Sequence, residues 1–101
     1  MEILFITGIA LVAREGTATR DLLIGTFGLP LESMGGAYFA SDKIEGAKHF
    51  GVWPLEEAAE ACFGTKEWPR DRPIPQLSIE LEVRDAAAVS AAEKELRAKG
   101  L

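Results

Sequence analysis

The chain has 101 residues, enough for one domain with a modest hydrophobic core, in the size range where a partner subunit often adds stability. Its 16 Asp and Glu residues outnumber its 11 Lys and Arg residues, and no basic cluster offsets this balance locally. An acidic surface repels phosphate backbones and anionic lipid heads. The composition therefore argues against a nucleic acid or a membrane surface as a partner.

The single cysteine and the first residues of the chain indicate the cellular compartment in which the protein is expected. Cys62 is the only cysteine, so no internal disulfide can form, and without an adjacent base it reads as a structural thiol. The opening apolar run begins with Met1 and Glu2 and lacks the basic leader of a signal peptide. Arg14 and Glu15 end this run well short of the roughly 18 residues that span a bilayer. We expect a cytoplasmic protein.

The first 30 residues predict a strand followed by a helix. Ile3–Ala13 is almost wholly apolar and rich in β-branched residues, which favours a buried strand, with Gly16 and Thr17 ending it and capping the helix. Helical spacing then predicts a buried stripe, with Arg20 and Asp21 facing away from it. The stripe consists of Ala18, Leu22, Leu23 and Phe27. Gly28 suits the left-handed position after a helix, and Pro30 cannot continue it.

Three short strands are expected next. Leu31–Met34 and Ala37–Ala40 flank Gly35 and Gly36 and predict a hairpin. Ala47–Trp53 predicts a third strand that Pro54 ends. Alternation along this strand places His49, Gly51 and Trp53 on one face.

The second half predicts a helix, an irregular loop, a strand and a last helix. Leu55–Phe63 is a compact helical segment ended by Gly64, and Thr65–Pro75 carries three prolines. The strand that follows alternates strictly, and its apolar residues are Leu77, Ile79, Leu81 and Val83. Asp85 caps a helix with Val89, Ala92 and Leu96 on one stripe, which we expect to cover the apolar side of the strand.

These elements predict an α+β fold of unequal halves. Residues 1–54 form a βαβββ module, residues 55–75 form a linker helix and a proline-rich loop, and residues 76–101 form the strand and helix that begin a second module. The second module is incomplete, because its first strand and helix have no strands after them.

The succession of three segments resembles the vicinal-oxygen-chelate superfamily, which includes glyoxalase I, bleomycin resistance proteins and extradiol dioxygenases. The segments are Ile9-Ala10-Leu11-Val12, Phe27-Gly28-Leu29-Pro30-Leu31, and Ser78-Ile79-Glu80-Leu81-Glu82-Val83-Arg84-Asp85. The resemblance covers the whole chain and implies paired βαβββ modules around a cleft. Because three strands of the second module are missing, a further segment or a partner must complete it, and we expect a homodimer.

The resemblance also implies where metal ligands would stand. In metal-dependent members the first and last strands of each module supply His and Glu. The corresponding residues here are Gly8, Ser78 and, at or near the last strand, His49, while the fourth position falls in the missing segment. His49 is therefore only a weak metal candidate, and we expect no metal cofactor.

The cleft candidates are His49, Trp53, Ser78 and Glu80. A strand histidine bonded to a neighbour is a simpler interpretation of His49 than a base, because no oriented partner can be identified from the sequence. Glu80 and Glu82 share a strand face, which suits acid and base chemistry if enclosed but is more often solvated. Other aromatic residues that could stack on a planar ligand are Tyr38, Phe39 and Trp68.

Three function classes follow. The first is a small-molecule binding protein of the bleomycin-resistance type, with an organic ligand in a cleft shared between modules or subunits. The alternative is a metal-dependent lyase or dioxygenase whose remaining ligands lie in the missing segment. The third is a module whose role is association. The sequence does not decide whether the protein is an enzyme.

Overall fold

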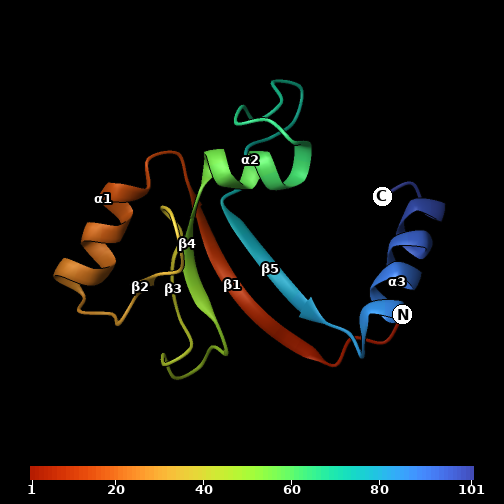
Figure 1. Cartoon of the computed structure of the whole chain (residues 1–101), viewed down its shortest axis with the longest axis horizontal. Coiled ribbons are helices and arrows are strands. Elements are labelled where there is room, and N and C mark those ends of the chain that lie inside the picture. The colour runs from red at the N-terminus through yellow and green to blue at the C-terminus, as the bar shows by residue number, and fades with distance from the viewer.

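The computed structural model describes residues 1–101 and has an α+β architecture built on one five-stranded mixed sheet (Figure 1). The strands are β1 (Phe5–Ala13), β2 (Glu32–Ser33), β3 (Phe39–Ser41), β4 (Phe50–Pro54) and β5 (Leu77–Glu82). The helices are α1 (Gly16–Arg20), its π-helical continuation η1 (Asp21–Thr26), α2 (Leu55–Phe63) and α3 (Ala86–Ala98). The expected fold class and the βαβββ order followed by βα are confirmed.

Strand β1 lies inside the sheet, between the two halves of the chain. The strand order is β2-β3-β4-β1-β5, with β1 parallel to β4 and antiparallel to β5. Ile9 is paired with Phe50 on one side and with Ile79 on the other. A parallel pair needs a long crossover connection, which here consists of the first helix and the β2-β3 hairpin.

The core lies between the sheet and the first helix. Leu23, Leu31 and Val52 are 8%, 6% and 1% exposed, and half-buried apolar side chains pack around them. These include Leu11, Ala13, Phe39 and Phe50 from three strands. Burial of these side chains holds the first helix against one face of the sheet.

The first helix buries a different face from the one expected. Leu23 is buried as predicted, but Leu22 and Phe27 are 47% and 62% exposed. The helix widens to π geometry from Asp21 onward, and the Phe27 N–H donates to the Leu22 carbonyl at 3.0 Å. Ala18, in the α-helical part, is exposed as well, so the helix turns Leu23 and Ile24 toward the sheet from its start. The wider turn then moves Phe27 further from the stripe. Arg20, expected to face away, instead lies over the Phe39 ring at 4.5 Å.

The ends of this helix show one correction and one confirmation. The carboxylate of Glu15, rather than Gly16 or Thr17, caps the start by accepting from the Thr17 and Ala18 N–H groups. These hydrogen bonds, the Thr17 bonds foremost, lower the pKa of Glu15. Gly28 takes the expected left-handed conformation, with φ of 70°, and the Leu29 N–H donates back to the Leu23 carbonyl at 2.9 Å.

The expected packing of the last strand under the last helix is wrong. Leu77, Ile79 and Leu81 are 45%, 54% and 53% exposed, and α3 stands apart from β5 (Figure 1). β5 is an edge strand, and one strand is too narrow to cover the apolar stripe of a helix. The radius of gyration is 15.0 Å, above the about 13 Å of a compact chain of this length.

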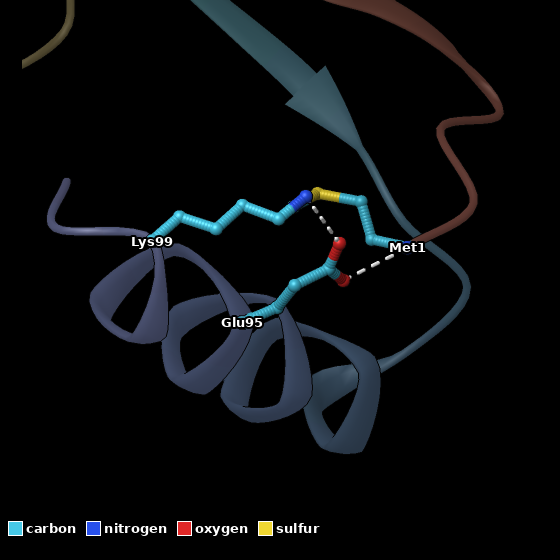
Figure 2. Close-up of polar contacts among 3 residues, drawn as sticks. All are labelled: Met1, Glu95 and Lys99. Carbon is cyan, nitrogen blue, oxygen red and sulfur yellow. Dashed lines mark hydrogen bonds and ion pairs between the residues drawn. The ribbon is translucent and has the colours of Figure 1, made fainter.

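Polar contacts hold α3 to the start of the chain. Glu95 accepts a hydrogen bond from the Met1 amino group at 2.9 Å and another from Lys99 Nζ at 3.4 Å (Figure 2). These bonds, that from the amino group foremost, lower the pKa of Glu95. Asp85 caps α3 as expected, accepting from the Ala88 N–H at 2.9 Å. No helix of the structure is both long enough and apolar enough to cross a membrane.

Two adjacent leucines test the position of the core. Leu23→Ala should reduce the free energy of unfolding by roughly 2 to 5 kcal/mol, because it opens a cavity beside Val52. Leu22→Ala, the matched control on the exposed side of the same helix, should cost under about 1 kcal/mol. Urea unfolding followed by circular dichroism measures both values. Equal losses would mean that the helix is not rotated as described.

Candidate functional site

The sheet face opposite the first helix brings the predicted cleft residues together. We call it the site face and define it by Gly8, Ala10 and Val12 of β1, His49, Gly51 and Trp53 at and along β4, and Ser78 and Glu80 of β5. The strand register arranges them in rows across β1. His49 and Glu80 flank Gly8, Gly51 and Ser78 flank Ala10, and Trp53 lies beside Val12.

His49 and Glu80 meet at one end of this face. A Cβ atom added to Gly8 would lie 3.2 Å from the His49 Cβ and 3.3 Å from Glu80 Oε2, so both residues pack close against this glycine. Trp53 is four residues along the strand from His49, a distance of about 13 Å. Ser78 lies in the row between them. A ligand that touched all four candidates would have to lie along the strands.

His49 is held by two partners that the sequence did not reveal. Tyr38 Oη is 2.7 Å from His49 Nε2, and Asp42 Oδ1 is 2.6 Å from His49 Nδ1. The His49 side chain is 21% exposed and that of Asp42 is 73% exposed. The structure agrees with the simpler interpretation of His49 as a histidine bonded to its neighbours, and it identifies the two partners. A usable signal was the alternation of Tyr38, Ala40 and Asp42, of which Tyr38 directly precedes and Asp42 directly follows β3, the neighbour of β4.

The chemistry of the partners determines the tautomer of His49. The Asp42 carboxylate can only accept, so the hydrogen of the neutral imidazole lies on Nδ1 and is donated to Asp42. Nε2 then has a lone pair, and the Tyr38 hydroxyl donates its proton to it. We assign this arrangement from the hydrogen-bond partners. It forms a chain of donors that runs from Tyr38 through His49 to Asp42.

The surroundings keep Tyr38 protonated. Partial burial raises the pKa of the Tyr38 hydroxyl, and the negative charges of Glu80 and Asp42 raise it further. The Tyr38 and His49 rings are 6.0 Å apart and tilted by 40°, so they meet through the hydrogen bond and do not stack. Tyr38 therefore acts as a polar group here and not as the stacking surface considered from the sequence.

A bulge in β1 brings a second carboxylate near this end of the face. The register between β1 and β5 shifts at Thr7, whose hydroxyl donates to Glu82 Oε2 at 3.0 Å. Asp42, Glu80 and Glu82 give the region three carboxylates, while the nearby Lys48 Nζ lies 4.5 Å above the Phe5 ring. This balance disfavours anionic ligands.

A hollow of about 470 Å³ adjoins His49. Its walls are the first half of β1, including Gly8, and the loop of residues 44–49 that leads into β4. The loop contributes Ile44 and Lys48, so the walls offer both apolar and charged groups. Its apolar residues Ile9 and Ile44 belong to the sheet face that the first helix covers, so the hollow is not part of the site face.

The residues at the positions where the resemblance implies metal ligands offer few atoms that could bind a metal ion. Gly8 has no side chain, and both ring nitrogens of His49 are already hydrogen-bonded. No three His, Cys, Asp or Glu side chains within residues 1–101 converge in the way a metal site requires. Cys62, read as an apolar structural thiol, is exposed on α2.

Comparison of the chain with protein-family models, with curated proteins and with solved structures finds no match in any of the three. The functional argument therefore rests on the geometry of the site.

A substitution at Gly51 tests how closely Tyr38 packs against this position. A Cβ atom at position 51 would lie 2.8 Å from the Phe39 carbonyl oxygen and 2.9 Å from Tyr38 Oη. Gly51→Ala should therefore cost about 1 to 3 kcal/mol in unfolding free energy and displace Tyr38 from His49. The control Gly25→Ala meets nothing within 4 Å and should be neutral or stabilising. An unchanged stability of Gly51→Ala in urea titration would contradict this geometry.

Calorimetric titration with zinc tests the metal expectation. We expect no micromolar binding at the site face, because Gly8 and Ser78 supply no strong ligand and His49 is engaged on both nitrogens. Micromolar binding that His49→Ala abolishes would overturn this expectation and favour the metal-dependent lyase or dioxygenase.

Proposed function

We propose that the chain is a small-molecule binding protein of the vicinal-oxygen-chelate type that holds an organic ligand on the site face. The observation that carries the proposal is the fixed orientation of His49 between Tyr38 and Asp42, beside Glu80. The strand order β2-β3-β4-β1, with β1 parallel to β4, supports the βαβββ part of the resemblance.

The charges of the site face favour one class of ligand. Asp42 and Glu80 lie at the His49 end, and Trp53 offers an aromatic surface further along the strands. A planar cation could stack on the indole while its charge faces the carboxylates. We therefore propose a neutral or, preferably, cationic planar ligand.

Indole fluorescence tests this proposal. In a Trp68→Phe background Trp53 is the only tryptophan, and the planar cation proflavine should quench it with micromolar affinity. Glu80→Gln should weaken binding about tenfold, because it removes a charge that faces the ligand. Planar anionic naphthalene-1,5-disulfonate is the control and should not bind. Equal binding of the two dyes would argue against the proposed ligand class.

We further propose that a second copy of the chain completes the fold. The apolar side of β5 and the facing stripe of α3 border a hollow of about 460 Å³. Its apolar lining includes Ile3, Leu81, Val83, Val89 and Leu96. Exposed apolar surface of this extent beside an open strand edge favours association.

Antiparallel pairing of β5 with its copy is the simplest closed arrangement. Centred on Ile79, this pairing places Leu81 opposite the partner's Leu77 and Glu80 opposite the partner's Ser78. No carboxylate then faces another across the pair, and the two site faces become continuous. The ligand cleft is shared between subunits in this arrangement.

Light scattering at micromolar concentration tests the dimer. We expect about 22 kDa, twice the 10.9 kDa chain mass, and no dissociation in added salt because the contact is apolar. Ile79→Lys should yield monomers, whereas Leu22→Lys, at an exposed leucine on the first helix, should remain dimeric. A stable, folded wild-type monomer would overturn the proposal.

A further inference from the structure

The hydrogen-bond chain on the site face is arranged to move a proton. Tyr38 donates to His49 Nε2 at 2.7 Å, and His49 Nδ1 donates to Asp42 at 2.6 Å, so every link is already within transfer distance. The Tyr38 oxygen keeps a lone pair that His49 does not use. We propose that Tyr38, His49 and Asp42 form a proton-transfer site that removes a proton from the ligand held on this face. This inference rests on the proposed ligand site and adds a chemical step to it.

Tyr38 is the residue that touches the substrate, and it exchanges one proton for another. Its oxygen takes the substrate proton as its own proton passes to His49 Nε2. The phenol is neutral before and after the step, which agrees with surroundings that disfavour the phenolate, namely partial burial and the charges of Glu80 and Asp42. His49 becomes an imidazolium, and its new positive charge lies between the hydroxyl of Tyr38 and the carboxylate of Asp42.

Asp42 is a positioning residue in this scheme. Its carboxylate fixes the hydrogen of the neutral imidazole on Nδ1, which leaves Nε2 free to accept. It also stabilises the imidazolium that forms, as the carboxylate does in a Ser-His-Asp triad. Gly51 contributes by leaving room for Tyr38, since a Cβ atom there would lie 2.9 Å from Tyr38 Oη.

The charge of the site selects the substrate class. Asp42 and Glu80 oppose an anionic product, so a neutral acid that becomes an anion is disfavoured. A cation that loses a proton becomes neutral overall and avoids this repulsion. The geometry therefore points to planar cations that carry an acidic C–H bond next to a carbonyl group.

N-methyl-4-acetylpyridinium is a probe of this class. Its acetyl C–H bond breaks, the electron pair moves into the carbonyl group, and the enolate oxygen that forms balances the pyridinium charge. Tyr38 oxygen receives the proton, and the Tyr38 proton goes to Nε2. Reversal in deuterium oxide returns a deuteron to carbon, so no oxidant or second reactant is needed. Loss of the acetyl signal in proton NMR measures the rate.

The wild-type protein should exchange the acetyl protons at least tenfold faster than buffer. Tyr38→Phe and His49→Gln should each lose at least tenfold of the rate, because a positioned acid or base supplies about 100-fold to 10,000-fold. Trp68→Phe is the matched control and should retain the rate, because the Trp68 ring packs on Phe63 of α2 and donates to the Pro73 carbonyl. Circular dichroism shows whether each variant is folded. A wild-type rate no higher than that of folded Tyr38→Phe overturns the proposal.

Further measurements test the role of Asp42 and distinguish a failure of proton transfer from a failure of ligand binding. Asp42→Asn should lower kcat with little change in KM and shift the His49 tautomer seen by ¹⁵N NMR. Asp42→Glu should restore both kcat and the tautomer. An unaltered tautomer would refute the positioning role. Quenching of Trp53 by the same pyridinium reports binding alone. Binding without exchange refutes proton transfer and leaves the ligand site standing, whereas absence of binding refutes both.

Discussion

The pairing of β1 on both of its edges is the constraint on which the rest of the structure depends. β1 bonds to β4 in parallel and to β5 in antiparallel orientation, so it joins two segments that are far apart in the sequence. Only this pairing places His49 and Glu80 on either side of Gly8. Gly8 and Ala10 of β1 are themselves buried, and His49 and Glu80 pack close against Gly8. The site therefore forms only when β1 is paired with both β4 and β5.

One face of this sheet is covered over only part of its width. α1 and its π-helical continuation cover β1, β3 and β4 there and bury Leu23 and Val52. On the same face Leu77 and Ile79 of β5, in register with Leu11 and Ile9, stay exposed, and α3 has no further strands to cover. Apolar surface of this kind lowers its free energy by leaving water. The net charge of −5 opposes association only at long range, where salt screens it.

The site face combines an apolar strand surface with a small number of fixed polar groups. Tyr38 and His49 are positioned by each other and by Asp42, so their orientation costs little further entropy when a ligand arrives. Asp42, which orients the imidazole, also adds with Glu80 to the negative charge of the space around it.

The sequence by itself determined the elements whose pattern is local. Strict alternation predicted β5, Gly64 predicted the end of α2, and Asp85 predicted the start of α3. The α+β class and the strand on which His49 and Trp53 share a face followed from the same periodicities. Local patterns suffice for these features because their hydrogen bonds and side-chain directions repeat within a few residues.

Tertiary structure alone decided which residues meet and which are buried. Tyr38 and Asp42 became partners of His49 because β3 pairs with β4, and periodicity within one strand does not specify the neighbour's register. Leu81 fits a buried pattern yet is exposed, since burial depends on what packs against a strand as well as on its alternation. Phe27 is exposed at the end of the π-helical part of the helix. A prediction from α-helical spacing does not include the wider π-helical turn. Burial and partnership are properties of the assembled chain, so no local pattern could supply them.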